Sequence, residues 1–99
     1  MLSITKTTEN GIAVIMPEGR IDTVTAPEFE QAIKDVLPGI KTLRLDFGKL
    51  DYISSAGLRV ILFAQKAMNS QGDMVICNAK DEIKEIFDIT GFSDILTIE

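Results

Sequence analysis

Residues 40–68, which decide the fold expected for this chain, read IKTLRLDFGKLDYISSAGLRVILFAQKAM. Between positions 40 and 47, apolar Leu43 and Leu45 alternate with charged residues, which predicts a strand with one buried face. Residues 58–68 are apolar around most of the circumference of a helix, so this helix is expected to be buried between the sheet and its neighbours. A strand followed by a buried helix is typical of an α/β protein.

The N-terminal side adds a hairpin and a helix. Residues 3–8 and 12–16 are β-prone, and the Asn10-Gly11 pair between them favours a tight turn because both residues tolerate positive φ. A helix is expected from Thr25 to Leu37, because Thr25 and Glu28 form a capping-box pattern and a proline stands in the first turn. A Pro-Gly pair then ends it.

The C-terminal side predicts a strand over 73–77, a helix over 81–89 ended by Gly91, and a last apolar segment over 92–98 with a helical turn and a strand. The expected order is therefore ββαβαβα and a short terminal piece. At 99 residues the chain has room for one core, so we expect a single domain over residues 1–99. The fold class is α/β: a mixed β-sheet, with an antiparallel N-terminal hairpin and then parallel strands, packed with about four helices.

Composition excludes several classes of function. Ten Lys plus Arg stand singly against fifteen Asp plus Glu, a net charge of −5, which argues against direct nucleic-acid binding. The chain has no His, so a Ser-His-Asp triad and His-ligated metal sites are excluded. Its one cysteine, Cys77, lies in an apolar run and is expected to be a buried, inert thiol. We expect no cofactor.

Hydropathy along the chain bears on its cellular location. The N-terminus lacks the basic start and apolar stretch of a signal peptide, and no apolar segment is long enough to cross a membrane, so we expect a cytoplasmic protein without membrane insertion.

Asp46 and Asp51 are candidates for paired catalytic carboxylates or a hard-metal site. No third ligand pattern accompanies them, so the expectation is no metal and no catalysis.

The most unusual local feature is the stretch Asp51-Tyr52-Ile53-Ser54-Ser55-Ala56-Gly57, which delivers two hydroxyls to the first turn of the buried helix. A helix N-terminus has unpaired N–H groups and partial positive charge, so either a capping hydroxyl or a phosphate is stabilised there. One interpretation makes Ser54 or Ser55 an N-cap. The other makes Ser55 a phosphoacceptor. Local spacing does not choose between them.

Three stretches together resemble the STAS domain, and specifically the bacterial anti-sigma factor antagonists. They are Gly19-Arg20-Ile21-Asp22 with the Thr25-Ala26-Pro27-Glu28 helix start; Leu45-Asp46-Phe47 through Ser54-Ser55-Ala56-Gly57 to Leu62; and Met74–Cys77 followed by Ile86–Gly91. They span nearly the whole chain in the family's order. The resemblance implies a STAS-type fold and a binding protein rather than an enzyme.

What the resemblance implies about function is a cycle of partner switching. The unphosphorylated antagonist binds an anti-sigma factor that is a serine kinase and carries the ATP, and this releases the sigma factor. The kinase phosphorylates one serine of the antagonist and ends the binding, and a PP2C-type phosphatase resets it. The family also includes regulatory or structural subunits of transporters and signalling assemblies, which is the alternative function. We expect a monomer or weak dimer.

The resemblance places the phosphorylated serine two positions before the glycine, at Ser55, with Ser54 as the alternative acceptor. Well-known members have an acid before the phosphorylated serine, and this chain has Ser54 there. The family's acid after the second strand corresponds to Asp22. The implied partner-binding residues are Asp22, Ser54, Ser55, Gly57 and Arg59, although a solvated role is the simpler interpretation of Arg59 from spacing alone.

Overall fold

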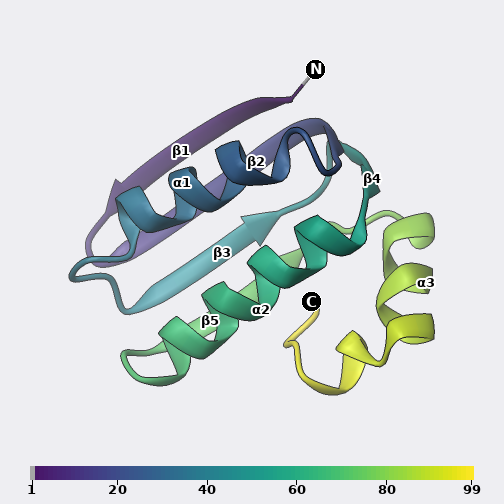
Figure 1. Ribbon diagram of the computed structural model, residues 1–99. Helices are drawn as coiled ribbons and strands as arrows, with labels where there is room; N and C mark the ends of the chain where they lie inside the picture. The colour runs from purple at the N-terminus through teal and green to yellow at the C-terminus, as the bar shows by residue number, and fades with distance from the viewer. Residues whose placement is uncertain (1) are drawn as a thin grey trace.

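The computed structural model describes residues 2–99 and confirms the mixed α/β fold (Figure 1). The strands are β1 (Ser3–Glu9), β2 (Ile12–Ile21), β3 (Thr42–Asp46), β4 (Leu50–Ile53) and β5 (Asp73–Cys77). The helices are α1 (Ala26–Val36), α2 (Ser55–Asn69) and α3 (Asp81–Thr90), followed by a short 3-10 turn, η1 (Phe92–Asp94). Three α-helices and this turn agree with the expectation of about four helices.

The sheet has the order β1-β2-β3-β5, with β4 beside the far end of β2. The β1–β2 pair is antiparallel and every other pair of strands is parallel. The hairpin turn is as predicted, because Asn10 and Gly11 have φ values of 53° and 79°. In the terminal segment the expected helical turn is present as η1, whereas the expected strand is reduced to a single parallel bridge between Ile98 and Ile76.

Strand β4 is the one strand that the expected order ββαβαβα lacks. The strand is four residues long and pairs with Gly19–Ile21, past a register shift in β2. Strand β2 therefore pairs with three strands: β1 along positions 12–18, β3 along positions 12–15 and β4 along positions 19–21. This arrangement puts the ends of β2 and β4, Ile21 and Ile53, side by side.

Helices α1 and α2 cover one face of the sheet, and α3 lies at its end beside β4 (Figure 1). The core between these layers contains Phe29 of α1, Phe47 after β3 and Phe87 of α3, all fully buried. The Phe47 ring lies 6.3 Å from that of Phe29 and 6.4 Å from that of Phe87, so one aromatic row links α1 to α3.

Helix α2 is buried as predicted along Leu58, Ile61, Ala64 and Met68. It also has an exposed strip, formed by Ser55, Arg59 and Lys66, which the sequence analysis did not separate from the buried face. Successive residues of a helix are rotated by 100°, so these three positions lie within roughly 40° of one another around the axis. The first two residues of this strip belong to the candidate site.

The capping-box prediction at Thr25 is wrong. Thr25 precedes α1, but its side chain makes no capping hydrogen bond to the helix. Its Oγ1 instead donates to the Arg20 carbonyl at 2.9 Å and accepts from the Asp22 N–H at 2.8 Å. The hydroxyl is therefore used to close the turn between β2 and α1, and Pro27 still occupies the first turn as expected.

Candidate functional site

Two strand-to-helix junctions meet at one edge of the sheet and form the candidate site. The β2–α1 junction contains Asp22, and the β4–α2 junction contains Ser54 and Ser55. The Ser54 N–H donates to the Ile21 carbonyl at 2.8 Å, so the start of α2 is bound to the end of β2. Parallel neighbours bring their carboxyl ends to the same edge, which is the physical reason that residues more than 30 positions apart in sequence meet.

Asp22 is half-buried and organises the first junction. Its Oδ1 accepts hydrogen bonds from the N–H groups of Val24 and Thr25, both at 3.0 Å. The Thr25 N–H lowers the pKa of the Asp22 carboxyl against the opposing effect of burial, and the Thr25 hydroxyl, the Val24 N–H and the Arg20 charge lower it further. Asp22 is therefore an anionic turn former at the edge of the site.

Ser54 and Ser55 have different surroundings. Ser54 is the N-cap of α2: it is half-buried and its Oγ accepts from the Gly57 N–H at 3.4 Å. Ser55 is the first residue of α2 and is exposed. The capping interpretation therefore holds for Ser54, and the hydroxyl of Ser55 faces solvent at the positive end of the helix.

Gly57 is buried beneath the site rather than on its surface. A Cβ built at this position would lie 2.6 Å from Cγ1 of Ile53 and 2.7 Å from Cγ2 of Ile21. Only glycine lets α2 approach the ends of β2 and β4 this closely. Gly57 thus supports the site by packing, which differs from the direct contact with a partner implied by the resemblance.

Arg59 lies one turn into α2, is exposed and lines a shallow hollow of about 260 Å³ between α1 and α2. The hollow has an apolar floor and a charged rim on which Arg59 and Glu30 stand. Its lining residues are Thr23, Ala26, Pro27, Glu30, Ala56, Arg59 and Val60. The hollow adjoins both junctions, so Arg59 belongs to the same surface as Asp22 and Ser55.

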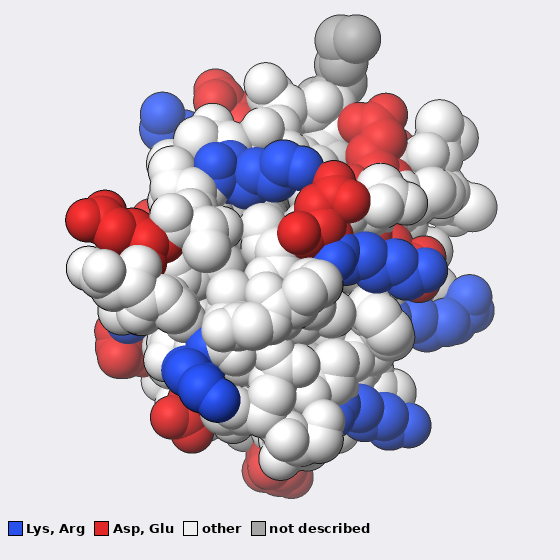
Figure 2. All heavy atoms as spheres, turned by 90° about the vertical axis from the view of Figure 1, so that its left-hand side faces the viewer, with Lys and Arg blue, Asp and Glu red and all other residues white. Residues whose placement is uncertain are grey.

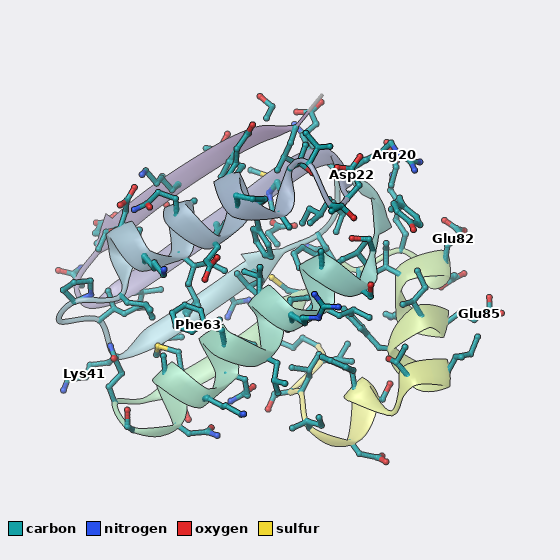
Figure 3. All side chains as sticks on the ribbon, viewed as in Figure 1. Arg20, Asp22, Lys41, Phe63, Glu82 and Glu85 are labelled. Atoms are coloured by element: carbon teal, nitrogen blue, oxygen red, sulfur yellow. The ribbon has the colours of Figure 1, made fainter. Side chains whose placement is uncertain are left out.

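The structure places three further residues at the candidate site that sequence reasoning did not select: Arg20, Tyr52 and Val24. The Arg20 guanidinium lies 4.3 Å from the centre of the Tyr52 ring, and Figure 3 shows Arg20 next to Asp22 at the end of β2. Val24, in the β2–α1 turn, is 83% exposed. Recognising β4 would have predicted the cross-strand pair of Arg20 and Tyr52, because these two residues are partners in its register.

The other chemical candidates do not form a second site. Asp46 accepts from the Gly48 N–H and the Asn78 amide, and Asp51 forms an ion pair with Lys80 at 2.6 Å, so the two carboxylates have separate partners. Cys77 is buried, and burial raises the pKa of its thiol. Within residues 2–99 no group of three or more Cys, Asp or Glu side chains is arranged to hold a metal ion.

Two further observations concern the charge on the surface and the character of the helices. On the face that Figure 2 presents, Lys and Arg side chains are interspersed with Asp and Glu, and this face carries no extended basic patch of the kind that binds a phosphate backbone. Among the helices of residues 2–99, none has the length and apolar character required to cross a membrane.

Comparison with known proteins identifies the family. The family model described as "STAS domain" matches residues 3–99. The anti-sigma-B factor antagonist of Listeria monocytogenes is 36% identical over 88 residues, which cover 86% of this chain and 76% of the relative. The chain belongs to the STAS domain family, as its motifs predict.

Solved structures agree on the fold. An anti-sigma factor antagonist from Mycobacterium paratuberculosis superposes with a TM-score of 0.90 at 21% identity, covering 99% of this chain and 85% of the other. The Bacillus cell fate determinant SpoIIAA in its phosphorylated form superposes with a TM-score of 0.76 at 15% identity, covering 98% and 91%. At these identities the superpositions establish the shared architecture.

Proposed function

We propose that this chain is a cytoplasmic anti-sigma factor antagonist that works by partner switching. Its unphosphorylated form binds an anti-sigma factor that is also a serine kinase, and this releases the sigma factor. The kinase brings the ATP and the catalysis, and phosphorylation of the chain ends the binding. A PP2C-type phosphatase restores the binding form. The chain itself is a ligand and a substrate, not an enzyme. The name of the Listeria relative supports this class of function.

The observation that carries the proposal is the exposed hydroxyl of Ser55 at the first position of α2. A kinase must reach the acceptor oxygen, and within residues 2–99 the Ser55 hydroxyl has no hydrogen bond that must first be broken. Ser54 is less suited, because its Oγ caps α2 through Gly57. We therefore assign Ser55 as the acceptor in preference to Ser54. SpoIIAA, which has the same fold, occurs in a phosphorylated form.

The proposed docking surface consists of Asp22, Val24, Ser54, Ser55 and Arg59. A phosphate on Ser55 adds a charge of about −1.5 to −2 and three acceptor oxygens at the centre of this surface. The N-terminal N–H groups of α2 stabilise that charge locally, so the fold persists while the surface becomes repulsive to a partner's acidic groups. The switch is thus a local change of charge and bulk.

The charge mechanism is tested by measuring kinase binding of Ser55→Asp beside Ser55→Asn, which has nearly the same size without the charge. We expect Ser55→Asp to weaken binding at least tenfold and Ser55→Asn to stay close to the parent, with unchanged circular dichroism for both. Equal binding of the two variants would show that charge at Ser55 does not control the partner.

The assignment of the acceptor is tested by incubating the pure chain with candidate serine kinases and ATP and mapping phosphate by mass spectrometry. Label is expected on Ser55, to be lost in Ser55→Ala and retained in Ser54→Ala. Label found on Ser54 alone would overturn the assignment and leave the class of function open.

A further inference from the structure

Arg59 stands four residues after Ser55 on the exposed strip of α2. Side chains at positions i and i+4 of a helix are neighbours, and an acid that precedes a base by four residues is the favourable order for an ion pair. Unphosphorylated Ser55 is uncharged, so it cannot form this ion pair with Arg59. In the described residues Arg59 takes part in none of the ion pairs, and Glu30, which shares the rim of its hollow, pairs with Lys34 instead.

We propose that a phosphate on Ser55 forms an intrahelical ion pair with Arg59 and withdraws this arginine from the hollow between α1 and α2. The inference rests on the proposed function, which supplies the phosphate. Phosphorylation then changes the docking surface twice: it adds negative charge at Ser55 and it neutralises the free cation on the rim beside it. A guanidinium suits this role because its planar fork of donors matches phosphate oxygens.

The position of the arginine makes the device specific for Ser55. The residue four positions after Ser54 is Leu58, which is buried, so a phosphate on Ser54 has no cation at this spacing. Lys66 lies on the same exposed strip but two turns beyond Arg59, too far along the helix to reach the phosphate. Arg59 is therefore at the favourable spacing from Ser55, and Lys66 is a matched cation outside that spacing.

The test uses the 99-residue chain with phosphoserine incorporated directly at position 55 during synthesis, so that no kinase is required. The pKa of the phosphate is measured by ³¹P NMR titration in the parent, Arg59→Gln and Lys66→Gln backgrounds, at low and high salt. We expect Arg59→Gln to raise the phosphate pKa by roughly 0.15–0.4 pH unit at low salt. Lys66→Gln is expected to change it much less, and high salt is expected to reduce the difference.

Equal phosphate pKa values in the parent and Arg59→Gln backgrounds would overturn the ion pair, and so would an equal effect of Lys66→Gln, which would indicate general charge only. Kinase binding by the same phosphorylated chain is measured in parallel. If this chain still binds the kinase, the proposed function fails whatever the titration shows, so the two failures are distinguishable.

Discussion

At the scale of single residues, Gly57 and Asp22 hold the two junctions of the site in place. Gly57 lets α2 approach the strand ends, where a methyl group would lie under 3 Å from two buried isoleucines. Asp22 folds the β2–α1 turn around its own carboxylate. Neither residue needs to touch a partner to matter for binding, because each one fixes the positions of residues that do face solvent.

The first prediction concerns Gly57→Ala. The added methyl group overpacks Ile21 and Ile53, which costs about 1–3 kcal/mol, and this outweighs the gain of up to about 1 kcal/mol in helix propensity. The free energy of unfolding should therefore fall, as measured by urea denaturation. Ser55→Ala, which changes an exposed residue of the same turn, is the control and should stay within about 0.5 kcal/mol of the parent. A Gly57→Ala variant as stable as the parent would contradict the packing role of Gly57.

The second prediction concerns Asp22 and pH. Hydrogen bonds, that of the Thr25 N–H first, lower the pKa of this carboxyl in the folded state relative to the unfolded state. The charged form therefore stabilises the fold above the unfolded pKa, near 3.9, and this contribution is lost as the pH falls through the folded value. Asp22→Asn should be less stable than the parent at pH 7, and the gap should narrow near pH 3. A gap that does not depend on pH would show that the charge is not involved.

At the scale of elements, the site is built by the start of α2 and by the end of β2, a strand that has other strands on both sides. The short strand β4 makes few backbone bonds of its own, and it is held between β2 and the glycine-mediated contact with α2. The N-cap at Ser54 is a further link, because its N–H bonds β2 while its Oγ bonds α2. The first turn of α2 is therefore fixed from both sides.

The third prediction follows from this cap. Ser54→Ala removes the acceptor for the Gly57 N–H and should cost about 1 kcal/mol of stability in thermal or urea unfolding. Ser54→Asp, which retains a capping oxygen and adds a charge favourable to the helix dipole, should restore most of the loss. Failure of aspartate to restore stability would indicate that Ser54 contributes through something other than capping.

At the scale of the whole molecule, the exposed edge of the sheet bears on the oligomeric state. Strand β1 is an edge strand, and Lys6 is the register partner of the buried Ile15, so its side chain lies on the face that the helices cover. There it forms an ion pair with Asp35 of α1 at 2.8 Å. A charge directed inward from an edge strand is a known barrier to edge-to-edge pairing, because pairing would bury it.

The fourth prediction is that the chain is monomeric at micromolar concentration and that Lys6→Val increases self-association, as measured by sedimentation velocity. Lys66→Val, which makes the same change on the exposed strip of α2, is the control and should leave the sedimentation coefficient unchanged. Lys6→Val remaining monomeric at all concentrations would show that this lysine does not guard the edge.

Features that depend on near neighbours along the chain follow from the amino-acid order alone. The Asn10-Gly11 turn, the helix ends at the Pro-Gly pair and at Gly91, and the helical and strand periods follow from local backbone preferences, and all of them appear in the structure. The family motifs likewise predicted which serines and which acid belong to the candidate site.

The way in which these elements meet depends on contacts between segments that are distant in the sequence. Strand β4 was missed because its partner is the distant end of β2, and the Thr25 hydroxyl left its predicted cap because the β2–α1 turn offered it the Arg20 carbonyl and the Asp22 N–H. The burial of Gly57 and the cap at Ser54, which leave Ser55 as the exposed hydroxyl, depend on contacts across two strand ends. Periodicity along one segment carries no information about such contacts, because they are set by the packing of separate elements.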